Sequence, residues 1–87
     1  MISLFHKIAA VAPLDGFRLL VCFQSGERML YDMKPLLHRV KDFSPLLSVP
    51  GLFRQAVVDP GGFGVSWNDE IDISGSELWA NGQLVRE

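Results

Sequence analysis

The densest group of chemically capable side chains lies between residues 68 and 72, where oxygen ligands gather: Asn68, Asp69, Glu70 and Asp72. Such oxygen atoms are the ligands that Ca²⁺ and Mg²⁺ prefer, and a bound metal could activate water for hydrolysis. The oxygens at positions 68, 70 and 72 alternate as they do in a calcium-binding loop. That loop requires glycine at its sixth position and glutamate at its twelfth, where this chain has Ile73 and Trp79.

The pattern therefore favours an acidic turn between two extended segments, and we predict no metal ligands. Asparagine and aspartate are common in turns because their side chains bond to nearby backbone groups. We expect Ile71 and Ile73 to point inward and Asp72 to point outward. A metal-dependent hydrolase built on residues 69–72 remains the second alternative hypothesis for function.

Two further patterns could belong to an enzyme. Gly61, Gly62 and Gly64 are spaced in neither of the two glycine patterns of phosphate-binding loops, and no long helix is expected after them. We predict a plain turn there. Cys22, the single cysteine, could form a nucleophile–base pair only with His6 or His38. Cys22 lies within an apolar strand pattern, where cysteine is usually an inert core residue, so we predict no catalytic residue and no cofactor.

Positive charge is concentrated in one predicted helix over residues 33–43, at Lys34, His38, Arg39 and Lys41. A solvated helix face explains this cluster most simply. The same four residues are our candidate partner-binding surface, for an acidic protein or, as the first alternative hypothesis, for DNA through the helix at 33–41. A formal net charge of −2 gives no general attraction to nucleic acid, so we expect none to be bound.

Composition indicates one small globular domain spanning residues 1–87. Apolar residues make up 48% of the chain, a high share for a domain with so much surface, so we expect apolar surface to remain for a partner or a second copy. No segment has the length of a membrane span or the order of a signal peptide, and one cysteine permits no internal disulfide. We therefore expect a cytoplasmic protein without membrane contact.

The first part of the chain predicts three strands joined by turns, over residues 7–14, 17–23 and 27–32. In the second strand Phe17, Leu19, Val21 and Phe23 share one face. The opposite face is only half polar, so we expect this strand to be central and partly covered on both sides. Gly26 supplies the positive φ of the second turn, and Asp32 is placed to cap the helix over residues 33–43.

The second part of the chain predicts short helical turns over residues 42–55, then strands over 55–59 and 64–67 and an extension over 70–73. Trp67 and Trp79 are expected to fill the core rather than to anchor an interface. Ser74 and Glu77 have the spacing of a capping box, so they predict a short helix that ends at residues 81–82. Residues 83–87 are expected to form a loose tail.

Strands joined by hairpins, with one helix in the middle and one near the end, predict an α+β fold with a small antiparallel sheet. The order and spacing of several motifs resemble the bacterial family catalogued as domain of unknown function 2442, over residues 8–79. They are residues 23–27 (FQSGE), 30–37 (LYDMKPLL), Phe43 with Leu46 and Phe53, residues 65–68 (VSWN) and 71–73 (IDI).

The resemblance implies a small α+β domain without known catalytic residues. It also implies a two-protein module of antitoxin type, because many members are encoded beside another very small protein. After Trp67 this chain has Asn-Asp-Glu where relatives often have proline, asparagine and glycine, which leaves the turn type open. We therefore expect a non-enzymatic interaction domain that binds another small protein, itself or both, and no small-molecule ligand.

Overall fold

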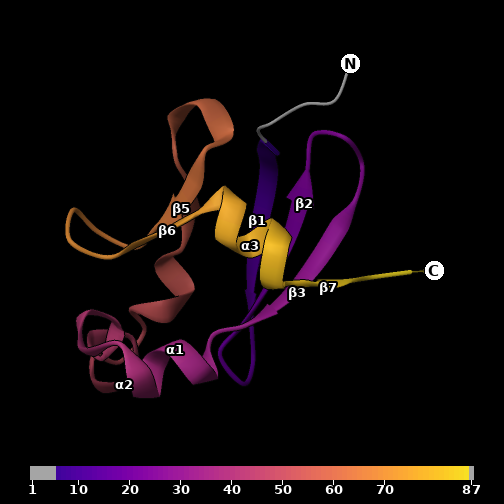
Figure 1. The fold of residues 1–87 in the computed structure, drawn as a ribbon. Helices are drawn as coiled ribbons and strands as arrows, with labels where there is room; N and C mark the ends of the chain where they lie inside the picture. The colour runs from indigo at the N-terminus through magenta and orange to yellow at the C-terminus, as the bar shows by residue number, and fades with distance from the viewer. Residues whose placement is uncertain (1–5, 87) are drawn as a thin grey trace.

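A computed structural model describes residues 6–86 and places their strands in two antiparallel sheets (Figure 1). The first sheet has the order β1 (Ile8–Leu14), β2 (Arg18–Phe23), β3 (Arg28–Asp32) and β7 (Gln83–Leu84). The second has the order β4 (Val57–Val58), β5 (Gly64–Ser66) and β6 (Asp72–Ser74). The α+β class with antiparallel pairing is confirmed, and the strands divide between two sheets where we expected one.

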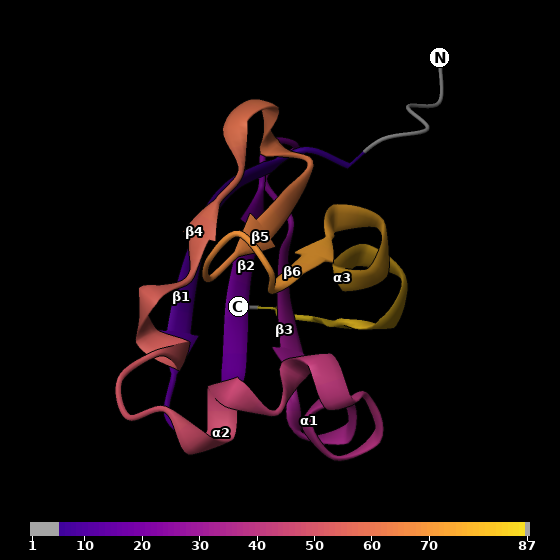
Figure 2. The ribbon, with the colours of Figure 1, turned by 90° about the vertical axis from the view of Figure 1, so that its left-hand side faces the viewer.

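Short helical segments connect the two sheets. The α-helices are α1 (Lys34–Arg39), α2 (Pro45–Ser48) and α3 (Gly75–Asn81), and single 3₁₀ turns occupy Lys41–Phe43, Phe53–Gln55 and Pro60–Gly62. Both views place α1, α2 and the three-stranded sheet on the same side of the four-stranded sheet (Figure 2). No helix within residues 6–86 has the length and apolar character needed to cross a membrane.

The core lies between the two sheets, and the alternation of side chains along each strand creates it. Leu19, Val21 and Phe23 of β2 are buried, as are Met29 and Tyr31 of β3. The three-stranded sheet and the helical segments supply the opposing side chains: Leu37, Leu46, Phe53, Val65, Trp67, Ile71, Ile73 and Leu78. β2 is central, as predicted, because β1 and β3 pair with it on either side.

Both hairpin turns at the start of the chain require positive φ angles, but the first uses an unexpected residue. Gly26 has φ +100°, as predicted, and Gly16 has φ +79°. Phe17 was expected inside the second strand, and instead it has φ +56° in the loop that joins Leu14 to Arg18. Two successive residues at positive φ close this short loop, and β2 therefore begins at Arg18.

The predicted helix over residues 33–43 is shorter than expected. α1 ends at Arg39, and Val40 is extended with φ −112° and ψ 110° before the 3₁₀ turn begins. The burial pattern follows the break: residues 38–42 are exposed, Phe43 then packs partly against the core, and Leu46 on α2 is buried again. The predicted cap is wrong by one residue: Met33 is the N-cap, with no side-chain cap hydrogen bond, and Asp32 lies just before it, where its Oδ1 accepts from the Lys34 amide at 3.0 Å.

The C-terminal helix follows its predicted boundaries, whereas the segment after it does not. The Ser74 hydroxyl accepts from the Glu77 amide at 3.1 Å, which confirms this half of the capping box. The Glu77 carboxylate accepts from Tyr31 and Asn81 through Oε2, so it ties α3 to β3. Residues 83–87 were expected to form a loose tail, but Gln83–Leu84 pair with β3 as β7. This pairing satisfies backbone groups of β3 that would otherwise lack a partner. Residue 87 lies outside the described range.

Leu78 offers a direct test of the core between α3 and the sheet, because its side chain is fully buried. Replacing it by alanine should lower the free energy of unfolding by about 2–5 kcal/mol, through lost burial and a cavity. Urea unfolding measures this change. Leu47→Ala is the matched control, because Leu47 is 43% exposed. This substitution should lower the free energy of unfolding by less than about 1 kcal/mol. Equal losses in the two variants would contradict the packing.

Candidate binding surfaces

The acidic residues at 69–72 form a turn. The Asn68 side-chain oxygen accepts from the amides of Glu70 at 2.8 Å and Ile71 at 2.9 Å, which closes the loop. Ile71 and Ile73 are buried and Asp72 is exposed, as predicted. Within residues 6–86 no three histidine, cysteine, aspartate or glutamate side chains come together as metal ligands. The hydrolase hypothesis therefore has no assembled site to support it.

The glycines at residues 61–64 serve close packing. A Cβ atom added to Gly62 would lie 2.7 Å from the carbonyl oxygen of Ile8, and one added to Gly64 would lie 2.7 Å from that of Ile73. Gly61 and Gly62 also have positive φ angles. A side chain at Gly62 would therefore separate the β4–β5 turn from β1, and one at Gly64 would separate β5 from β6, which explains glycine at these two positions. The predicted turn is confirmed.

The three residues considered for nucleophilic catalysis lie apart. Cys22 is half-buried on the face of β2 that points away from the core. His6 stacks on Trp79 with 3.6 Å between ring centroids and meets Phe23, which points into the core. His38 is exposed on α1. A nucleophile and its base must lie within hydrogen-bond reach, so these residues form no catalytic pair.

The basic residues of our candidate partner-binding surface are all exposed, but they point to different places. Lys34 binds Asp32 at 3.1 Å and donates to the Gly16 carbonyl at 2.9 Å, so it braces the first hairpin turn. Arg39 lines a hollow with Tyr31, whereas Lys41 lines a different hollow beside Glu70. The break at Val40 separates these last two. His38 stays exposed on α1.

A polar network joins α3 to the four-stranded sheet. The hydroxyl of Tyr31 donates to Glu77 Oε2 at 2.8 Å, and the Asn81 side-chain amide donates to the same oxygen at 2.8 Å. Burial, followed by the hydrogen bond to the negative Glu77, raises the pKa of Tyr31 above its usual value. Tyr31 is therefore a fixed hydrogen-bond donor at neutral pH, and its contact with Glu77 holds α3 in place.

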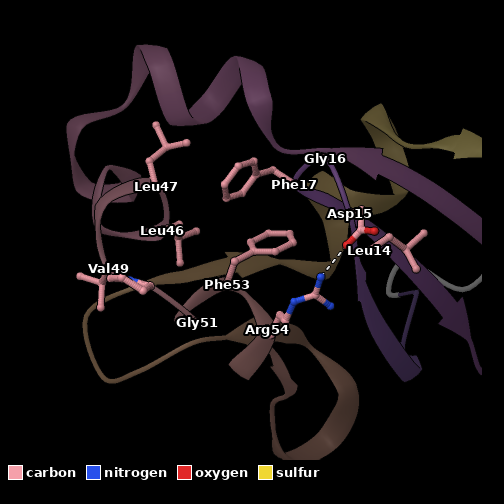
Figure 3. Close-up of a pocket in the computed structure, with 11 residues that line it drawn as sticks. Leu14, Asp15, Gly16, Phe17, Leu46, Leu47, Val49, Gly51, Phe53 and Arg54 are labelled. Carbon is pink, nitrogen blue, oxygen red and sulfur yellow. Dashed lines mark hydrogen bonds and ion pairs between the residues drawn. The ribbon is translucent and has the colours of Figure 1, made fainter.

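An apolar groove of about 230 Å³ opens between the first hairpin turn and the 42–55 segment (Figure 3). The rings of Phe17 and Phe53 lie at its centre with centroids 5.2 Å apart. Leu46 and Leu47 are on one side, and the ion pair between Asp15 and Arg54 is on the other. A groove of this volume has room for one apolar side chain, below the size usual for sites that bind small molecules.

Phe17 is the strained residue in this groove. Residues other than glycine rarely have positive φ, and an aromatic side chain makes the conformation less favourable. Three contacts hold it there: the ring packs on Phe53, its carbonyl accepts from the Met33 amide at 2.9 Å, and the adjacent Arg18 pairs with Asp32. The turn therefore fixes the start of α1 against the sheet.

A further apolar surface is the outer face of the four-stranded sheet, apart from the large exposed hydrophobic side chains at Val40, Leu47, Val49, Val57, Phe63 and Leu84. We use this name for the outward side chains of β1, β2 and β3 in three rows across the sheet: Ala10–Cys22–Arg28, Ala12–Leu20–Leu30 and Leu14–Arg18–Asp32. Leu20, Cys22 and Leu30 are half-buried, and Ala10 and Ala12 are exposed. We expected cover on both sides of β2, but within residues 6–86 the helices and the second sheet lie on the opposite side (Figure 1, Figure 2).

The half-polar pattern of β2 was the sequence signal for this surface. Leu20 and Cys22 alternate with the buried residues of the same strand, and Leu30 does so in β3. Sequence periodicity indicates which residues share a face, but it does not tell whether another part of the same chain covers that face. Apolar surface left over for a partner was one expectation and the basic helix was another; the outer face is an apolar surface that no described helix or second-sheet strand covers.

The Tyr31 network should make stability depend on alkaline pH. The pKa of Tyr31 is higher in the folded protein than in the unfolded chain, so the folded state retains the proton more strongly. The stabilisation is present below about pH 10 and is lost as the pH rises further. Tyr31→Phe should lower the free energy of unfolding by about 1 kcal/mol near pH 7. Above pH 10 the free energy of unfolding should fall less steeply in the variant than in the parent.

Urea unfolding between neutral and alkaline pH measures this dependence, and near-ultraviolet absorption follows the ionisation directly because Tyr31 is the single tyrosine. Parallel pH profiles of the two proteins would refute the assignment. So would ionisation of Tyr31 at the ordinary pKa of tyrosine.

Substitutions at Phe17 should separate its packing from its backbone strain. Phe17→Ala and Phe17→Gly remove the same ring contact, but only glycine accepts a positive φ without strain. We expect both variants to be less stable than the parent and the glycine variant to be about 1 kcal/mol more stable than the alanine variant. Urea unfolding gives the order. A more stable alanine variant would contradict a strained turn in solution.

Comparison with known proteins agrees with the resemblance in the sequence. No curated protein and no solved structure matches the chain significantly. A family model described as "Protein of unknown function (DUF2442)" matches residues 8–83, which include β1, β2 and β3 of the first sheet and all three strands of the second. The chain therefore belongs to the family of domain of unknown function 2442.

Proposed function

We propose that the chain is a non-enzymatic protein-interaction domain whose contact surface is the outer face of the four-stranded sheet. The observation that carries this proposal is the apolar middle row, Ala12–Leu20–Leu30, on a sheet face that no described helix or second-sheet strand covers. A flat apolar surface bordered by charged residues is typical of protein contacts.

The physical argument rests on the cost of apolar surface in water. Each square ångström removed from water contributes about 25 cal/mol, so a partner that buries several half-exposed side chains gains a few kcal/mol. Two arginines and Asp32 border the apolar rows and would fix the orientation of a partner. The face offers no group of polar side chains converging on a small ligand, which favours a protein as its occupant.

The alternative functions have weaker support. DNA binding through residues 33–41 would need the basic side chains to act together, but Lys34 already pairs with Asp32, and Arg39 and Lys41 line separate hollows. Hydrolysis would need a metal site that residues 69–72 do not assemble within the described chain. A two-protein module of antitoxin type in the cytoplasm is the setting that we propose, because it supplies a small protein partner.

The test compares capture of the product of a neighbouring gene by the parent chain and by Leu20→Arg. Leu20 lies at the centre of the outer face, so a charge there should reduce capture at least about tenfold while urea unfolding stays close to that of the parent. Co-expression followed by affinity purification and quantification of the eluted partner measures this.

Leu47→Arg is the matched control, since it places the same charge on an exposed leucine of the Figure 3 groove. If Leu47→Arg still captures the partner and Leu20→Arg does not, the result supports the outer face as the contact surface. The reverse pattern would move the contact to the groove and refute the assignment. Equal capture by all three proteins would also refute it.

A further inference from the structure

We propose that the partner of the outer face adds an extended strand to the open edge of the four-stranded sheet, beside β7. This inference rests on the proposed function and adds the kind of segment that the partner supplies and the edge with which it pairs. Its basis is the direction of the backbone N–H and C=O groups along residues 82–86.

The pairing of β7 with β3 fixes which backbone groups face outward. Gln83 pairs with Leu30, and the Val85 amide donates to the Arg28 carbonyl at 2.9 Å. In an antiparallel ladder, successive residues direct their N–H and C=O groups to opposite sides of the strand. Gln83 and Val85 face β3, so the N–H and C=O of Leu84 face away from it. Among residues 6–86 no strand pairs with β7 on that side.

The extended run along this edge is longer than the two residues of β7 (Figure 1). Gly82 is extended, with φ −77° and ψ 162°, and the Val85 amide continues the pairing past Leu84. Residues 82–86 contain no proline, so every residue of the run has an N–H group. An added strand therefore has a run of backbone with which to pair, and Leu84 lies at its centre.

The opposite edge of the same sheet is protected against such pairing. β1 contains Pro13, which lacks an N–H, and its register with β2 shifts between Ile8 and Ala10. The turn at Gly62 lies against the Ile8 backbone, and β4 lies beside β1 (Figure 2). Proline, a bulge and covering segments are devices that keep a sheet edge from pairing with another chain. The edge at β7 lacks proline and is exposed, so a partner can reach it.

The chemistry of the edge specifies its occupant. A row of alternating N–H and C=O groups is complemented by another extended backbone. A helix does not fit, because its own backbone groups are bonded to one another. The Leu84 side chain is 41% exposed and lies on the same side of the sheet as Met29, so an apolar side chain opposite it would bury it. The partner segment is therefore an extended strand with an apolar residue at its centre.

The added strand would continue the outer face of the sheet. Gln83 pairs with Leu30, so it extends the middle row Ala12–Leu20–Leu30 by one position. The strand residue beside Gln83 would fall in the same row and point to the same side. A partner that covers the outer face therefore meets the edge as part of one continuous surface.

A proline at position 84 tests the backbone contact. Leu84→Pro removes the outward N–H, whereas the pairing with β3 uses Gln83 and Val85 and is kept. The residue before a proline favours extended backbone, which Gln83 already has. We expect capture of the neighbouring gene product to fall at least about tenfold, because a carbonyl of the added strand is left unpaired. Co-expression with affinity purification measures the capture, and urea unfolding establishes that the variant is folded.

Leu84→Ala is the matched control, because it shortens the same side chain and keeps the N–H. Capture by this variant should stay within about threefold of the parent. Equal losses in the two variants would place the contact on the side chain and overturn strand addition. Undiminished capture by folded Leu84→Pro would overturn it as well.

Amide hydrogen exchange detects the added strand without a substitution. In the purified complex with the neighbouring gene product, exchange of the Leu84 amide should slow at least about tenfold relative to the free chain, because this amide gains an acceptor. The Val85 amide is already bonded to the Arg28 carbonyl, so its exchange should slow less. A Leu84 amide that exchanges equally fast in the free and bound chain would contradict the inference.

The two proposals fail separately in these experiments. If Leu20→Arg loses capture and Leu84→Pro keeps it, the outer face is supported as the contact surface and strand addition is overturned. If Leu84→Pro loses capture and Leu20→Arg keeps it, the edge is supported and the outer face is refuted. A parent chain that captures no partner would refute the proposed function and this inference with it.

Discussion

Burial of one face of the four-stranded sheet is the interaction on which the rest of this structure depends. β2 and β3 direct Leu19, Val21 and Tyr31 to the same side, and the second half of the chain folds onto that side. An antiparallel sheet has two faces, and within residues 6–86 the helices and the second sheet cover one of them. The other face carries the contact surface that we propose.

The short segments between the sheets are positioned by contacts that cross from one part of the chain to another. Trp67 is buried and donates its ring N–H to the Phe53 carbonyl at 3.0 Å, which joins the second sheet to the 42–55 segment. Tyr31 reaches Glu77 on α3, and Phe17 holds both Phe53 and the start of α1. These contacts satisfy buried polar groups while they close the core.

Several polar side chains that could have formed a site are committed to structural contacts: Glu77 binds Tyr31, Asp32 accepts from the Lys34 amide, and Asn68 closes a turn. What remains open is apolar and bordered by charge of both signs. A surface of that composition binds through area and fixes its orientation through charge, and it needs no reactive group.

The sequence by itself determined much of the local structure. Period-two alternation assigned Leu19, Val21 and Phe23 to one face of a central strand, and the spacing of Ser74 and Glu77 located the last helix. Both features are short-range, so neighbouring residues are sufficient to specify them. The same local logic identified the turn at residues 68–70.

Only the tertiary structure decided where those faces lie relative to one another. The division into two sheets, the pairing of Gln83–Leu84 with β3 and the positive φ of Phe17 each depend on residues far apart in the chain. The binding surface depends on them as well. The packing of the rest of the chain decides which face of a sheet remains open. Core burial depends on contacts across the whole molecule, so a local sequence pattern does not specify it.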